Sequence, residues 1–145
     1  MDAWLRQRAW KGQIVGNATV YVFEHHGSVL GFYAITAGGV EHLNAPGEVR
    51  RNAPNPIPVL LVARLGVDVK AQGRKLGRLL LQDALLRAIQ ISETIGFRAL
   101  LIHCRDETAR DFYMHAVPSF QPSPTDALHL FMPLDALRRA GESPS

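Results

Sequence analysis

The chain has 145 residues, of which 47% are hydrophobic and 20% are charged. That length corresponds to one domain, whose folding would remove roughly 68–70% of the unfolded surface from water. No apolar run approaches the ~18 uncharged residues that a membrane span needs, and the start of the chain lacks the basic-then-apolar order of a signal peptide. We therefore expect a cytoplasmic protein with a single domain over residues 1–140 and a disordered tail over residues 141–145.

Cysteine usage and charge exclude some classes of protein and leave others open. The single cysteine, Cys104, excludes an intramolecular disulfide and leaves too few thiolates for a structural zinc site. Sixteen Lys and Arg residues outnumber thirteen Asp and Glu residues. Most of the basic residues are arginine, which forms bidentate contacts with phosphate. An arginine-rich composition also arises in GC-rich genomes. The charge of +3 therefore fits a phosphate-bearing partner without requiring one.

The first part of the chain predicts a helix, a hairpin and a loop. Residues 1–10 carry apolar side chains at helical spacing. Residues 19–24 are rich in β-branched and aromatic side chains, and residues 29–37 return across a turn at residues 25–28, which predicts an antiparallel hairpin. Residues 44–58 contain four prolines and three asparagines, which predicts an exposed loop.

The rest of the chain alternates apolar runs of strand length with amphipathic segments. The expected strands are residues 59–69, 98–103 and 128–132. The first expected helix follows a basic segment at residues 72–78 and runs to about residue 95. The second runs from residue 106 to just before Pro118, and the third covers residues 134–140. A hairpin followed by this alternation predicts an α/β (α+β mixed) fold in which helices flank a mixed sheet.

The junction between the central strand and the helix after it is the most informative feature of the sequence. The first amides of a helix have no partner within the helix, and with the helix dipole they attract anions such as pyrophosphate. The junction is neither a Walker loop nor the three-glycine dinucleotide fingerprint. The alternative interpretation is an ordinary turn whose glycines serve only the backbone angles.

This junction resembles the acetyl-coenzyme A loop of the GNAT superfamily of N-acetyltransferases, which has the form Gln/Arg-x-x-Gly-x-Gly/Ala after a central strand. The resemblance implies a GNAT-like sheet, acetyl-CoA as the acetyl donor, and main-chain contacts from the strand end that include one amide at the oxyanion. Lys75 stands where the family usually has its first glycine, and we expect weaker coenzyme binding from this change. The implied cofactor-binding residues are Leu65, Gly66, Val67, Gln72, Gly73, Arg74, Lys75, Leu76, Gly77 and Arg78.

Residues 107–113 resemble the family's Ala-x-x-Phe-Tyr helix, in which the tyrosine lies beside the coenzyme sulfur. The resemblance makes Tyr113 the candidate general acid. A tyrosine of ordinary pKa about 10 keeps its proton near pH 7 and can donate it to a leaving thiolate of pKa about 8.5. The alternative is a core aromatic side chain packed beside Phe112.

No general base is evident from the sequence. His103 ends a strand near the expected active site, but a histidine at a strand end more often has a hydrogen-bonded structural role than a catalytic one. Glu41, His42 and Glu107 are no stronger candidates for the base. Cys104 lacks an activating partner at a recognisable spacing and is expected to be a buried structural thiol. No pair of histidines has the spacing of metal ligands, so we expect no metal site.

Three segments resemble the acetyltransferase toxins of type II toxin–antitoxin modules, which acetylate the α-amino group of aminoacyl-tRNA. They are residues 2–9, residues 64–68 followed by residues 72–85, and Phe112-Tyr113 with residues 123–131. The resemblance implies aminoacyl-tRNA as the substrate, a ribbon–helix–helix antitoxin as a partner and a homodimer. Family members usually carry an initial strand and a fuller first helix before the segment that corresponds to Trp4-Leu5 here, so either the start of this sequence is not the natural one or the protein is a shortened member whose sheet lacks its first strand.

Two other functions are compatible with the same residues. One is a small-amine or protein N-acetyltransferase, which would lack a basic surface around the acceptor mouth. The other is a truncated, non-catalytic CoA-binding remnant, which the lysine at position 75 and the missing strand would favour. Contacts with the acceptor-stem phosphates would come from surface arginines, and the candidates are Arg6, Arg8, Arg50, Arg51 and Arg110.

Overall fold

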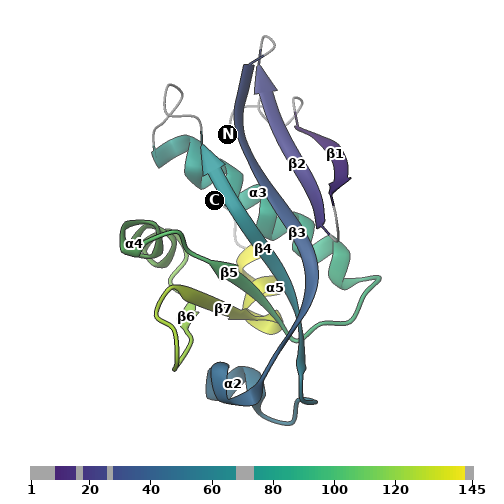
Figure 1. Cartoon of the computed structure of the whole chain (residues 1–145), viewed down its shortest axis with the longest axis vertical. Helices are drawn as coiled ribbons and strands as arrows, with labels where there is room; N and C mark the ends of the chain where they lie inside the picture. Colours follow the sequence, from purple (N-terminus) through teal and green to yellow (C-terminus); the bar gives the residue numbers. More distant parts are fainter. Residues whose placement is uncertain (1–8, 16–17, 26–27, 68–73, 143–145) are drawn as a thin grey trace.

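The computed structural model describes residues 9–15, 18–25, 28–67 and 74–142, which form a seven-stranded sheet with helices on both faces (Figure 1). The strand order is β1-β2-β3-β4-β5-β7-β6. β4 and β5 are parallel and every other neighbouring pair is antiparallel, so the predicted mixed sheet is confirmed. The strands are β1 (Ala9–Val15), β2 (Ala18–His25), β3 (Ser28–Val40), β4 (Ile57–Val67), β5 (Ala99–His103), β6 (Gln121–Pro122) and β7 (His129–Pro133).

The helices are a 3-10 turn η1 (His42–Asn44), α2 (Gly47–Arg50), α3 (Arg74–Ser92), α4 (Glu107–Ala116) and α5 (Leu134–Glu142). Of the described helices, none combines the length and apolar character of a membrane span. α3 ends at Ser92, three residues before the predicted position, in turns whose amides at Thr94 and Ile95 both donate to the carbonyl of Ile91. α5 continues to Glu142, so residues 141–142 are helical rather than disordered, and residues 143–145 lie outside the described residues.

The predicted hairpin is confirmed by the antiparallel pairing of β2 with β3, and β1 adds an edge strand that was not predicted. The predicted helix over residues 1–10 is wrong at its last two residues, because Ala9 and Trp10 pair with Phe23 and Val22 of β2. Cross-strand pairing here outweighs a weak helical spacing. Residues 1–8 lie outside the described residues.

The predicted exposed loop over residues 44–58 is wrong in part, because this stretch holds a short helix and contributes to the core. Pro46 precedes the first turn of α2, where the missing amide of a proline costs no hydrogen bond. Val49 and Ile57 are fully buried against Val59 and Phe131. The sequence shows no sign of this burial, because the apolar residues between the prolines are too few to form a recognisable helix or strand pattern.

The larger core lies between the sheet and the pair α3 and α5, which lie side by side behind it (Figure 1). The predicted apolar face of α3 is confirmed: Leu81, Ala84, Leu85 and Ala88 are buried. Leu100 of β5 is fully buried on the same side. Because side chains alternate along a strand, Leu101 faces the opposite side, where it joins the core around α2.

A partly buried polar network joins α3 to the sheet. The hydroxyl of Tyr33 on β3 donates to Asp83 at 2.5 Å and accepts from Nε of Arg87 at 2.8 Å. Arg87 also pairs with Asp83 at 3.2 Å and lies 4.0 Å over the ring of Tyr21. Burial, and then the contact with Asp83, raise the pKa of Tyr33 above its ordinary range, so its hydroxyl keeps the proton that it donates. The network fixes the position of α3 along the sheet.

Candidate active site

The two parallel strands diverge at their carboxyl ends. β4 pairs with β5 only from Val59–Ala99 to Val62–Ile102, and β4 then continues to Val67 with β3 as its partner. Figure 1 shows β4 pointing toward the start of α3 and β5 pointing toward α4. In the described part of the chain, no strand pairs with the other edge of residues 63–67. These backbone groups are therefore free to bind an extended ligand.

A β-bulge lies on this free stretch of β4. Ala63 pairs with Ala34 and Gly66 pairs with Phe32, so residues 64 and 65 lie opposite one residue of β3, Tyr33. A bulge turns backbone amides out of the regular ladder. The predicted main-chain contacts at Leu65, Gly66 and Val67 therefore fall on the bulge and on the strand end after it.

The predicted anion site is only partly within the described residues. Gln72 and Gly73 lie outside them, and α3 begins at Arg74. Lys75 and Leu76 are in the first turn, so Lys75 has the helical backbone that a lysine needs at this position. This turn has no acidic residue, and Arg78 follows it with an exposed side chain. The free first amides of α3 and a positive local charge can bind a phosphate group.

Gly77 brings α4 against the start of α3. A Cβ atom at Gly77 would lie 3.3 Å from Cζ of Phe112, and the ring of Phe112 packs edge-on against Tyr113 with centroids 5.6 Å apart. The family resemblance assigned Gly77 to the cofactor loop, and the structure gives it a packing role between the two helices. The first turn of α3 and the side chain of Tyr113 are thereby held together.

Substitution of Gly77 tests this packing. In Gly77→Leu the side chain displaces Phe112, and with it Tyr113, so we expect kcat/KM for acetyl-CoA to fall by about tenfold or more, as displacements of about 1 Å do at active sites. Steady-state kinetics with acetyl-CoA as the varied substrate measure this. The matched control is Gly96→Ala, because a Cβ atom there meets no atom within 4 Å. Unchanged kinetics in folded Gly77→Leu would contradict the role of this contact.

Tyr113 is nearly buried on α4, with 6% of its surface exposed. Burial and then the neighbouring Cys104 raise the pKa of Tyr113 to about 12, against the opposing effect of Arg105. Among the described residues no hydrogen bond engages its hydroxyl. The predicted start of α4 is confirmed, since Asp106 caps the helix by accepting from the amide of Ala109 at 2.9 Å. Tyr113 therefore carries a firmly held proton near the divergence of the strands.

Cys104 has 7% of its surface exposed, and burial raises the pKa of its thiol to about 11. A thiol of such high pKa forms little thiolate at neutral pH, which agrees with the structural role expected for it. Within the described residues, no group of three His, Cys, Asp or Glu side chains is arranged to hold a metal ion.

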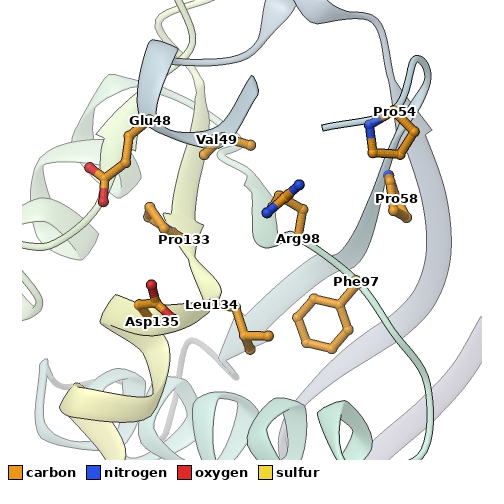
Figure 2. Close-up of a pocket in the computed structure, with 9 residues that line it drawn as sticks. All are labelled: Glu48, Val49, Pro54, Pro58, Phe97, Arg98, Pro133, Leu134 and Asp135. Carbon is orange, nitrogen blue, oxygen red and sulfur yellow. The ribbon is translucent and has the colours of Figure 1, made fainter. Parts of the chain in front are cut away.

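In the described part of the chain, two of the cavities flank the sheet. The first, of about 360 Å³, lies at the amino ends of β4 and β5, away from Tyr113, and Figure 2 shows Phe97, Arg98 and Asp135 among the side chains around it. The second, of about 560 Å³, lies on the face opposite α3 and reaches His103 at the carboxyl end of β5. The ring of His103 stacks on that of His129 with centroids 3.9 Å apart. This stack arises from the pairing of β5 with β7 and has no local signal in the sequence.

Known proteins are similar to this chain in fold and in sequence. No family model matches it. AtaT in complex with acetyl-methionyl-tRNAfMet superposes with a TM-score of 0.74 at 21% identity, over 92% of this chain and 90% of that one. A Tyr-to-Phe mutant of AtaT, bound to acetyl-CoA and the C-terminus of its antitoxin AtaR, superposes with a TM-score of 0.69 at 21% identity, over 87% of this chain and 73% of that one. The fold is that of the GNAT acetyltransferase toxins.

Sequence comparison identifies the family to which the chain belongs. A tRNA-acetylating toxin of Mycobacterium tuberculosis is 48% identical over 132 residues, which are 91% of this chain and 78% of that protein. A probable toxin TacT of Sinorhizobium fredii is 31% identical over 147 residues, covering 95% of this chain and 81% of the relative. The chain belongs to the family of tRNA-acetylating toxins, and it is an acetyltransferase.

Proposed function

We propose that this protein transfers the acetyl group of acetyl-CoA to the α-amino group of aminoacyl-tRNA and so blocks translation. The observation that carries the proposal is the bulged, unpaired end of β4 beside the first turn of α3 and Tyr113. In this arrangement the pantetheine arm extends β4 as an added strand, and the pyrophosphate lies at the first amides of α3. In this proposal the amide at the bulge stabilises the oxyanion of the tetrahedral intermediate.

Tyr113 is proposed as the general acid. The amine nitrogen attacks the thioester carbon and loses a proton to solvent, the carbon–sulfur bond breaks, and the departing sulfur takes the proton of the Tyr113 hydroxyl. A phenol of pKa about 12 is protonated throughout the neutral range. Because a free thiol has a pKa of about 8.5, the hydroxyl must act while charge develops on the sulfur, with the proton returned from solvent afterwards.

Aminoacyl-tRNA is a suitable acceptor on chemical grounds. Esterification to tRNA removes the carboxylate that holds an α-ammonium group charged, which leaves an amine that is more often neutral. Arg50 and Arg51 are exposed at α2 and remain candidates for phosphate contacts. Arg110 is less available, since it pairs with Asp111 at 3.1 Å, and Arg6 and Arg8 lie outside the described residues.

The partners are proposed on the same basis. An antitoxin that binds through its C-terminal segment is supported by the complex of AtaT with the C-terminus of AtaR. That this segment covers the active site follows from the family resemblance. That the antitoxin is a ribbon–helix–helix protein, and that the toxin is a homodimer, follow from the family resemblance. The proposed substrate places the reaction in the cytoplasm, where charged tRNA is used.

A labelling experiment tests the proposed substrate. The purified protein is incubated with radiolabelled acetyl-CoA and either charged tRNA, deacylated tRNA, or charged tRNA whose α-amine has been chemically formylated. We expect acid-precipitable label only with free charged tRNA, released by mild alkali as N-acetyl amino acid because the ester bond hydrolyses. Absence of label, with coenzyme binding shown by a thermal shift, would exclude this substrate. Label on polyamines or peptides instead would favour the small-amine or protein acetyltransferase.

A further inference from the structure

His103 stands at the divergence of β4 and β5, on the side of the sheet away from α3. It is the last residue of β5 and the first beyond the final pair, Val62–Ile102. Ile102 is buried in the core under α3, and side chains alternate along a strand, so His103 faces the opposite side. The two faces at this point therefore carry different groups: Tyr113 belongs to the core on the α3 side, and His103 lines the cavity on the other.

The cavity gives an acceptor access to His103. Its volume of about 560 Å³ is within the usual range for small-molecule sites, and its lining includes apolar strand residues such as Leu61 and Leu101 together with Glu41 and Thr125. Among the described residues no hydrogen bond occupies either ring nitrogen of His103. One nitrogen of the neutral ring is then free to accept a proton.

The groups around His103 keep it neutral near pH 7. Burial and then the stacked ring of His129 lower the pKa of His103, and Asp126 acts in the opposite direction. Asp126 also contacts Nε2 of His129 at 3.4 Å, which holds the second ring in place. Glu41 faces the cavity from the end of β3, and the β4 residues that line it are apolar. A neutral imidazole is the form that acts as a base.

We propose that His103 accepts the proton of the α-ammonium group of the acceptor, which enters through this cavity. The inference rests on the proposed function. The ammonium gives one proton to the ring nitrogen and becomes the neutral amine that attacks the thioester. As the amide forms, the nitrogen loses a second proton to solvent. Tyr113 donates its proton to the departing sulfur and regains one from solvent, and His103 releases its proton to solvent.

The spacing of the strand backbone is compatible with this role. His103 follows the pair Val62–Ile102, and the bulge begins two residues after Val62. At about 3.3 Å per residue along a strand and about 4.8 Å between paired strands, the bulge amides lie at least roughly 6–8 Å from the His103 backbone, because β4 and β5 diverge beyond Val62–Ile102. That separation accommodates an acetyl group and an amine, with the proton passing directly or through one water.

The test is the pH dependence of kcat/KM for charged tRNA in wild type and His103→Gln, from initial rates between pH 6 and pH 8.5. We expect the variant to be slower by about 10²-fold at pH 6.5, a usual effect of removing a general base, and by less than about fivefold at pH 8.5, where the substrate amine deprotonates by itself. The KM for acetyl-CoA should not change. His115→Gln is the matched control, because His115 is an exposed histidine of α4.

Two results would overturn the inference. One is a His103→Gln enzyme with the wild-type rate at pH 6.5. The other is a loss by the same factor at every pH, which would indicate a structural role. If wild type itself leaves charged tRNA unlabelled, the proposed function fails instead, so the two failures are distinguishable. Thermal unfolding of the variant checks that it is folded.

Discussion

Tyr113→Phe should lower kcat for acetyl transfer by about 10²–10⁴-fold and leave the KM for acetyl-CoA nearly unchanged, because it removes one proton donor and keeps the ring in place. The ring is packed edge-on against Phe112 and buried, so the loss of one hydroxyl leaves the packing intact. Since the pKa of Tyr113 is raised to about 12, the wild-type rate should show no decline from its ionisation between pH 6 and pH 9.

The matched control for this variant is Tyr21→Phe. Tyr21 is a nearly buried tyrosine of β2, and phenylalanine keeps the ring over which Arg87 lies. Its activity should equal that of wild type. A Tyr113→Phe enzyme with a normal kcat would remove Tyr113 from the acid step. A raised KM with a normal kcat would instead assign the hydroxyl to coenzyme binding.

Asp83→Ala should lower the free energy of unfolding by about 1–3 kcal/mol, because the buried hydroxyl of Tyr33 loses its acceptor and Arg87 loses its carboxylate. For a chain of this size that corresponds to a fall in Tm of roughly 3–10 °C in differential scanning calorimetry. Asp111→Ala is the control, because the side chain of Asp111 is 71% exposed and its ion pair with Arg110 should contribute less than about 1 kcal/mol.

The same variant should also affect activity, since Tyr33 is the residue opposite the β4 bulge. Loosening Tyr33 should raise the KM for acetyl-CoA several-fold at a temperature where Asp83→Ala is folded. Tyr33→Phe combined with Asp83→Ala should be less destabilised than the sum of the two single variants, because phenylalanine leaves no hydroxyl without an acceptor. Additive effects would show that the Tyr33–Asp83 hydrogen bond contributes little.

Several features of this protein follow from its sequence alone, because their signals are local. The period of apolar residues placed the buried face of α3, Asp106 marked the start of α4, and β-branched residues marked the β2–β3 hairpin. The glycine-bearing basic junction and the Phe112-Tyr113 pair carried the family resemblance, and with it acetyl-CoA and aminoacyl-tRNA. The roles of the individual site residues stay predictions.

Other features depend on contacts between residues far apart in the chain, which local patterns do not encode. The pairing of β1 with β2 turned a predicted helix end into a strand, and the burial of Val49 gave structure to a proline-rich loop. The bulge opposite Tyr33 and the stack of His103 on His129 follow from the register of neighbouring strands. Register is decided when whole faces are buried together, so only the tertiary structure determines which backbone amides and which ring nitrogens are free for chemistry.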